Sequence, residues 1–435
     1  MKYYSTAHTS PDVSLAEAVV KGLAPDRGLY MPERIERLPK EFFDNIDRMT
    51  FHEIALRVAA AFFGEDIPEA DLRRIVEETL SFPTPVVKVE DGIYALELFH
   101  GPTLAFKDVG ARFMARLLQY FISRSTDGRD VHVLVATSGD TGSAVANGFL
   151  GVDGIRVHVL YPKGKVSPIQ ECQFTTLGGN VTALEIDGVF DDCQRLVKTA
   201  FLDEELNRNL LLTSANSINV ARFLPQAFYY FNAYAQLKRH GLARDVVISV
   251  PSGNFGNLTA GLIAHRMGLP VKRFIAANNA NDVFFSYLQS GEYCPAPSIP
   301  TIANAMDVGD PSNFVRILDL YGNDHAVISS LISGATYSDG SIARTMQECR
   351  SRTGYQLDPH GAVAYRALKQ LLLPGETGLF LETAHPAKFR DAILKVTGQD
   401  VAIPERLKEF MDGEKQSIEL SSSYADFKAY LQTLY

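Results

Sequence analysis

The sequence predicts an α/β protein with two open, twisted, mostly parallel sheets flanked by helices, and with a mainly helical N-terminal segment. Three observations predict this fold. From about residue 93, short Val/Ile/Leu runs alternate with helical patterns, which is the order of parallel βαβ units. The alternation comes in two series, separated by a helical stretch near 219–238. Before residue 93, helical periodicity occurs without a long apolar strand run.

The N-terminal segment is assigned to residues 1–92. Apolar residues recur at helical spacing in SLAEAVVKGLA (14–24) and FHEIALRVAAAFFG (51–64). We expect this segment to pack as a separate layer.

The first α/β lobe is assigned to residues 93–235 and the second, larger lobe to 236–435. Strands are expected at DVHVLVATS, IRVHVLYP, NVTALEID, DVVISVP, VKRFIAANN and TGLFLETA. Helices are expected at TGSAVANGFLG, near 167–177, from Phe190 and at LTAGLIAHRMG. Parallel strands with helices on both faces follow from this order.

Composition restricts the function classes. The chain has 435 residues, 42 Lys+Arg against 51 Asp+Glu and a net charge of -9, which argues against a nucleic-acid or anionic-membrane surface. Neither a transmembrane stretch nor a signal peptide is visible, so a cytoplasmic location is expected. The four cysteines form no CxxC pair, so we interpret them as reduced core thiols and expect no metal site.

The motif PSGNFGN (251–257) lies between the run VVISV and a helical pattern. Small residues at a helix N-terminus let backbone N–H groups and the helix dipole bind an anion. The motif therefore predicts a phosphate site, although an ordinary glycine-rich turn is the alternative.

A second such turn, TSGDTG (137–142), follows the run VHVLVA and precedes another helix. Ligands of open α/β sheets bind beyond the carboxyl ends of the strands. Two turns in two lobes thus predict two anionic groups in one cleft, with a purely structural turn as the alternative.

Lys107 stands just before an amphipathic helix, within LFHGPTLAFKDVG (98–110). A cation is unfavourable at a helix N-terminus, so this lysine either extends into solvent or serves as a neutral amine. Its apolar neighbours and the positive helix end would both lower the amine pKa, as Schiff-base chemistry requires.

Together these segments resemble the threonine synthase family, in its longer bacterial and fungal branch, within the tryptophan synthase β-like class (fold type II) of pyridoxal 5'-phosphate (PLP) enzymes. The resemblance spans nearly the whole chain. It rests on these ordered motifs: GLAPDRGLYMPE, LELFHGPTLAFKDVG, ATSGDTGSAVANGF, LYPKGKVSPIQ, TLGGN, SANSINVARFLPQ, PSGNFGN, NAMDVGDPSNF, DPHGAVAYRAL and TAHPAKF. One departure is Arg27, where the family often has Gly; we expect it to alter a surface turn.

The resemblance implies a role for each matching residue. Lys107 would form the Schiff base with PLP, and Thr383 would contact the pyridine nitrogen. The cofactor phosphate would be held by Ser252, Gly253, Asn254, Phe255, Gly256 and Asn257. The substrate side would comprise Ser138, Gly139, Asp140 and Thr141.

The resemblance also implies a reaction: O-phospho-L-homoserine and water give L-threonine and phosphate, the last step of threonine biosynthesis. Lys107 would be the base for the α-proton. The leaving phosphate needs a separate cationic site; Lys163, Lys165 and Arg222 are the candidates, with solvated surface charge as the alternative. His100 and His385 are interpreted as structural.

Two alternatives remain at this point. One is another fold type II lyase, such as a hydroxy-amino-acid dehydratase or an O-phosphohomoserine phospholyase that makes 2-oxobutyrate. The other is a catalytically silent binding protein that keeps the turns as an anion sensor. The family contains both monomers and homodimers, so the sequence leaves the oligomeric state open.

Overall fold

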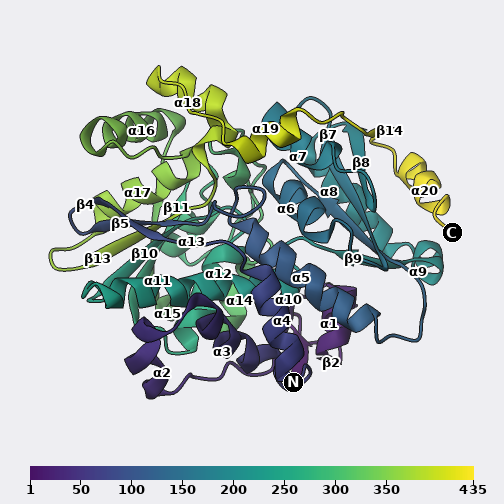
Figure 1. Cartoon of the computed structure of the whole chain (residues 1–435), viewed down its shortest axis with the longest axis horizontal. Helices are drawn as coiled ribbons and strands as arrows, with labels where there is room; N and C mark the ends of the chain where they lie inside the picture. The colour runs from purple at the N-terminus through teal and green to yellow at the C-terminus, as the bar shows by residue number, and fades with distance from the viewer. The chain divides into compact units, whose positions relative to one another are not determined.

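The predicted apolar runs form the central strands of two sheets, one in each of two units of the chain. The computed structural model describes residues 1–435 (Figure 1). Unit 1 comprises Met1, Met31–Phe106 and Phe223–Ala402, and unit 2 comprises Lys2–Tyr30, Lys107–Arg222 and Ile403–Tyr435. Both units are therefore discontinuous in sequence.

The sheet of unit 1 has six strands in the order β12-β11-β10-β13-β5-β4. Its pairs are parallel except for β4 with β5. The strands are β4 (Val86–Glu90), β5 (Ile93–Glu97), β10 (Val246–Pro251), β11 (Val271–Asn278), β12 (Ile332–Thr336) and β13 (Thr377–Glu382). Every residue of β10 and β13 is buried, because helices cover both faces of a parallel sheet.

Helices of unit 1 pack on both faces of this sheet (Figure 1). These helices include α11 (Ala227–Arg239), α12 (Gly256–Arg266), η3 (Asn304–Met306), α17 (Pro359–Leu371) and η4 (Pro386–Phe389). The others are α2 (Lys40–Asn45), η1 (Ile46–Arg48), α3 (Phe51–Phe63), α4 (Glu69–Thr79), η2 (Leu224–Gln226), α13 (Val283–Ser290), α14 (Phe314–Leu320), α15 (His325–Leu331), α16 (Asp339–Thr353) and α18 (Arg390–Thr397). α16 and α17 bury a cluster that includes Val247, Ile275 and Phe380 of the strands.

Unit 2 contains an all-parallel sheet in the order β14-β8-β7-β6-β9. Its strands are β6 (Val131–Ala136), β7 (Ile155–Pro162), β8 (Val181–Asp187), β9 (Leu211–Ser214) and β14 (Ile418–Ser421). Its helices are α1 (Leu15–Lys21), α5 (Lys107–Ile122), α6 (Asp140–Phe149), α7 (Pro168–Thr175), α8 (Phe190–Leu202), α9 (Glu204–Asn209), α19 (Glu405–Met411) and α20 (Tyr424–Gln432). The short strands β1 (Lys2–Ser5) and β2 (Val13–Ser14) pair antiparallel; β3 (Tyr30–Pro32) and α10 (Val220–Phe223) lie where the chain passes between units.

The units differ from the contiguous segments 1–92, 93–235 and 236–435 expected from the sequence. Residues 2–30 belong to unit 2, where α1 packs on α5, whereas α2, α3 and α4 belong to unit 1. The C-terminal residues 403–435 return to unit 2, where β14 pairs with β8 at the sheet edge. Edge strands are short and partly exposed, so their sequences carry a weak pattern.

Two smaller sequence expectations are also addressed by the structure. Arg27 occupies a left-handed turn with φ of 69°, a conformation that glycine adopts at less cost. The departure from the family pattern thus falls in a turn.

No helix is both long and apolar enough to cross a lipid bilayer.

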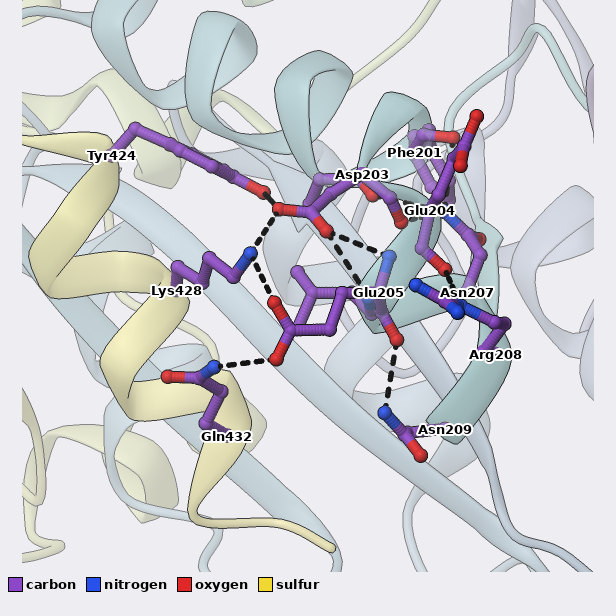
Figure 2. Close-up of polar contacts among 12 residues, drawn as sticks. Phe201, Asp203, Glu204, Glu205, Asn207, Arg208, Asn209, Tyr424, Lys428 and Gln432 are labelled. Atoms are coloured by element: carbon purple, nitrogen blue, oxygen red, sulfur yellow. Dashed lines mark hydrogen bonds and ion pairs between the residues drawn. The ribbon is translucent and has the colours of Figure 1, made fainter.

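The C-terminal helix α20 is attached to unit 2 by a polar network centred on Asp203 (Figure 2). Asp203 Oδ1 caps α9 by accepting from the N–H groups of Glu205 and Leu206. Its Oδ2 accepts from Tyr424 Oη at 2.8 Å and lies 2.8 Å from Lys428 Nζ. The side chains of Phe427 and Leu431 on α20 are fully buried.

We expect Asp203→Ala to lower the free energy of unfolding by about 1–3 kcal/mol, because a helix cap and two hydrogen bonds are lost. Burial alone would raise the pKa of Asp203, but hydrogen bonds from Lys428 and Tyr424 outweigh it and lower the pKa from 3.8 to about 2. The contribution of the Asp203 carboxylate to the free energy of unfolding is therefore complete above the ordinary pKa of an aspartate and is lost as the pH falls toward 2. Urea unfolding at several pH values measures this. The exposed neighbour Glu204→Ala is the control, expected within about 0.5 kcal/mol; equal effects of both variants would contradict the prediction.

Candidate active site

Lys107 is the first residue of α5, in unit 2, and its side chain is half-buried. Its Nζ donates to Thr141 Oγ1 at 2.8 Å. Arg222 Nη1 donates to the Lys107 carbonyl oxygen at 3.2 Å. The structure thus brings three of the predicted site residues together, from the starts of α5 and α6 and from α10.

The segment before Lys107 is joined to the TAHPAKF segment, and both lie in unit 1. Phe106 N–H donates to the Thr383 carbonyl at 2.8 Å, and Lys388 Nζ donates to the Thr103 carbonyl at 2.8 Å. Ala105 and Ala384 form an antiparallel bridge. Phe106, the residue immediately before Lys107, is therefore hydrogen-bonded to Thr383.

Thr383 and the turn Ser252–Asn257 lie at the same edge of the unit 1 sheet. They follow β13 and β10, which are neighbouring parallel strands, and carboxyl ends of parallel strands share one edge. Thr383 and Ser252 are both buried. This is the place where ligands of α/β sheets bind.

The turn Ser252–Asn257 leaves the N-terminus of α12 open to an anion. Phe255 is the N-cap residue with φ of 60°, and its side chain makes no capping hydrogen bond. The first N–H groups of a helix have no partner within the helix. In addition, Asn257 Nδ2 is buried without a hydrogen-bond partner, while its Oδ1 accepts from Tyr229 and Tyr230. These donors fit a phosphate group such as that of PLP.

Neighbouring backbone fixes the shape of this turn. Asn254 Oδ1 accepts from Ser312 N–H at 2.6 Å, and its carbonyl accepts from Asn313 Nδ2 at 2.9 Å. A Cβ at Gly253 would lie 2.8 Å from Met306 Cα. Only glycine therefore allows η3 to approach the turn this closely.

The TSGDTG turn is held by a residue that sequence reasoning did not assign. Gln170 is buried, its Nε2 donates to Asp140 Oδ1 at 3.0 Å, and a Cβ at Gly139 would meet its side chain at 2.6 Å. Thr137 Oγ1 accepts from the N–H groups of Gly139 and Gly142. Ser138 is half-buried. Gln170 ends the quoted motif LYPKGKVSPIQ, so the motif was the available signal.

We expect Gln170→Leu to lower the free energy of unfolding by about 1–3 kcal/mol, because buried Asp140 loses a hydrogen-bond donor. Thermal unfolding measures this effect. Gln432→Leu, on the surface of α20 with one hydrogen bond to Glu205, is the control. A Gln170 variant as stable as this control would contradict the prediction.

The three candidate cations for the substrate phosphate occupy different environments. Lys163 is exposed and pairs with Glu419 at 2.7 Å, and Lys165 is also exposed. Arg222 is buried; burial lowers its pKa to about 10, against the opposing charge of Asp108. Arg222 remains charged at neutral pH and is the one that contacts the Lys107 backbone.

Both histidines near the site make structural contacts. His385 Nδ1 accepts from Ala387 N–H at 3.1 Å and so caps η4. Burial, with His100 adding to it, lowers the pKa of His385 to about 4, which keeps this ring neutral. His100 Nε2 lies 2.8 Å from Glu97 Oε2.

Three family models match the chain. The model of the pyridoxal-phosphate dependent enzymes covers residues 78–380. The model of the threonine synthase N terminus covers residues 2–80, and that of the threonine synthase C-terminal region covers residues 361–431. Together they account for almost all of the sequence.

Individual relatives are similar over their full length. The threonine synthase of Haemophilus influenzae is 46% identical over 432 residues, which is 99% of each chain. The crystal structure of threonine synthase from Escherichia coli superposes with a TM-score of 0.92 at 43% identity, covering 100% of both chains. The PLP-bound threonine synthase from Brucella melitensis superposes with a TM-score of 0.92 at 36% identity, covering 100% of this chain and 99% of that one.

Proposed function

Because the chain belongs to the threonine synthase family of PLP-dependent enzymes, we propose that it converts O-phospho-L-homoserine and water into L-threonine and phosphate. The observation that carries the proposal is the position of Lys107. It begins α5 with its Nζ on Thr141 Oγ1, and it follows Phe106, which is bonded to Thr383. A lysine, a substrate turn and a ring-nitrogen partner are the groups that this chemistry needs.

Three groups of residues have a proposed task toward the cofactor. Lys107 would carry PLP, the N–H groups of Ser252–Asn257 and Asn257 Nδ2 would bind its phosphate, and the Thr383 hydroxyl would contact its ring nitrogen. Bound PLP supplies an electron sink for negative charge next to the substrate nitrogen. A hydroxyl favours a protonated ring nitrogen less than a carboxylate does, so Thr383 keeps that sink moderate.

Other residues are proposed to act on the substrate. The Lys107 amine takes the α-proton, because it is held beside the carbon that loses it. Ser138, Gly139, Asp140 and Thr141 orient the substrate carboxylate. Arg222 is favoured over Lys163 and Lys165 as the source of positive charge for the leaving phosphate, because it is buried beside Lys107 and charge acts more strongly away from water.

Steady-state assay with O-phospho-L-homoserine tests the reaction. We expect threonine and inorganic phosphate in equal amounts. If 2-oxobutyrate and ammonia are the chief products, the protein is a lyase of another specificity. If no product forms and no PLP is retained after cofactor addition, the protein is a binding protein instead.

A further inference from the structure

A chain of buried polar groups lies directly behind Thr383, within unit 1. Glu382, the last residue of β13, and Asp358, the N-cap of α17, are both fully buried. Asp358 N–H donates to Glu382 Oε1 at 2.6 Å. Asp358 Oδ1 in turn accepts from the His360 N–H and lies 2.7 Å from His360 Nδ1. These contacts join the C-terminal end of β13 to the N-terminal end of α17.

The same series of hydrogen-bonded groups extends to η3, which packs against the Ser252–Asn257 turn. His360 Nε2 accepts from Ala305 N–H at 3.2 Å, and Ala305 belongs to η3. A Cβ at Gly253 would lie 3.0 Å from the Ala305 carbonyl oxygen. Glu382, Asp358 and His360 thus connect Thr383 to the backbone that packs against Gly253.

The hydrogen bonds define the donor and the acceptor in each contact. Because His360 Nε2 accepts from the Ala305 N–H, its Nδ1 carries the ring hydrogen and donates to Asp358 Oδ1. Burial first, and then the charge of Asp358, raise the pKa of Glu382 well above its usual value, which favours a neutral carboxyl. Glu97 also faces this cluster, and it accepts from Tyr355 Oη at 2.9 Å and contacts His100.

One proton held between the two carboxyl groups would satisfy both of their remaining oxygens. Glu382 Oε2 and Asp358 Oδ2 are buried and have no other hydrogen-bond partner. Gly361 leaves room for this arrangement, since a Cβ there would come 1.6 Å from Glu382 Oε2. Buried ionisable clusters rarely increase stability over apolar replacements. What this cluster does is connect the end of β13, the start of α17 and η3.

We propose that Glu382, Asp358 and His360 are positioning residues that hold Thr383 and the Ser252–Asn257 turn at a fixed separation and thereby set the affinity of the protein for PLP. The inference rests on the proposed assignment of Thr383 to the ring nitrogen and of the turn to the phosphate. Two contact points on one rigid ligand bind well only when their spacing matches it.

The test compares Glu382→Gln with Glu382→Leu in PLP-free protein. Affinity for PLP is measured by titration of its visible absorption, and stability by thermal unfolding before PLP is added. We expect Glu382→Leu to bind PLP about 10- to 100-fold more weakly, as when supporting partners of bound groups are removed. It should also lower the free energy of unfolding, because the buried Asp358 N–H loses its acceptor; the control variant below separates the loss of affinity from the loss of stability. Glu382→Gln keeps a neutral hydrogen-bonding group and should restore the affinity to within about threefold.

The matched control is Glu376→Gln, just before the opposite end of the same strand. Glu376 pairs with Arg273 at 2.7 Å and with Lys272 at 3.2 Å. This variant should lower stability and leave PLP affinity unchanged. If Glu382→Leu does not fold, Gly361→Ala displaces the carboxyl and is expected to weaken PLP binding similarly. The proposal is overturned if folded Glu382→Leu or, in its place, Gly361→Ala binds PLP as wild type does.

These outcomes are separate from those of the proposed function. PLP affinity is read without turnover, so a product other than threonine would refute the reaction and leave this inference standing. Thr383→Ala serves as the reference variant. If its PLP affinity equals that of the wild type, Thr383 does not contact the ring nitrogen, and the inference, which depends on that assignment, is overturned.

Discussion

Replacement of Lys107 by alanine is expected to abolish covalent attachment of PLP and to lower kcat by about 10³-fold or more. The variant loses both the amine that carries the cofactor and the proposed base for the α-proton, and each role is worth orders of magnitude. Free PLP should still bind the Ser252–Asn257 turn, because the donors there are untouched. Visible absorption spectra and single-turnover kinetics measure the two losses.

The control for this variant is Lys395→Ala, which removes an exposed lysine in the last turn of α18. Its spectrum and kcat should match those of the wild type. Borohydride reduction followed by peptide mapping then locates the attached lysine directly. A label on any lysine other than Lys107, or on none, would refute the assignment.

The central strands could be predicted because they are buried on both faces. All six residues of β6 and of β10 are buried, so each appears in the sequence as a mainly apolar run, interrupted by His132 in β6 and by Ser249 in β10. β9 and β14 were not predicted. They lie at the edges of the unit 2 sheet, and β14 (IELS) has mostly exposed residues, so neither has the pattern of a central strand.

The organisation into two discontinuous units could not be predicted from local patterns. Whether residues 2–30 and 403–435 join the first or the second sheet depends on long-range pairing, such as Glu419 of β14 opposite Glu185 of β8. No periodicity within a window of about 11–18 residues contains that information. The contiguous division was the simplest order consistent with the sequence.

The site was predictable where one segment carries the chemistry. PSGNFGN, TSGDTG and the Lys107 segment each place their groups at the start of a helix, so each can be recognised alone. Gln170 and the Glu382–Asp358–His360 chain act across elements that are far apart in sequence. DPHGAVAYRAL is recognisable as a motif, but the sequence alone does not indicate that its Asp358 N–H is hydrogen-bonded to Glu382.

Gly253→Ala should weaken PLP binding by about 5- to 150-fold, the equivalent of about 1–3 kcal/mol for an overpacked methyl group. The added Cβ would lie 2.8 Å from Met306 Cα and 3.0 Å from the Ala305 carbonyl oxygen. Both are backbone atoms, and η3 is tied to His360. The turn must therefore move away from η3, and its N–H donors with it. Titration of PLP-free protein with PLP measures the change.

Gly340→Ala provides the matched control, since a Cβ at position 340 meets no atom within 4 Å. Gly340 lies in the first turn of α16, where alanine is favoured over glycine, so this variant should be as stable as wild type or slightly more so, with unchanged PLP affinity. If Gly253→Ala binds PLP as tightly as Gly340→Ala does, the phosphate does not depend on the shape of this turn. In that case the anion site must be sought elsewhere, first at the TSGDTG turn, where Gly139 is constrained in a comparable way by Gln170.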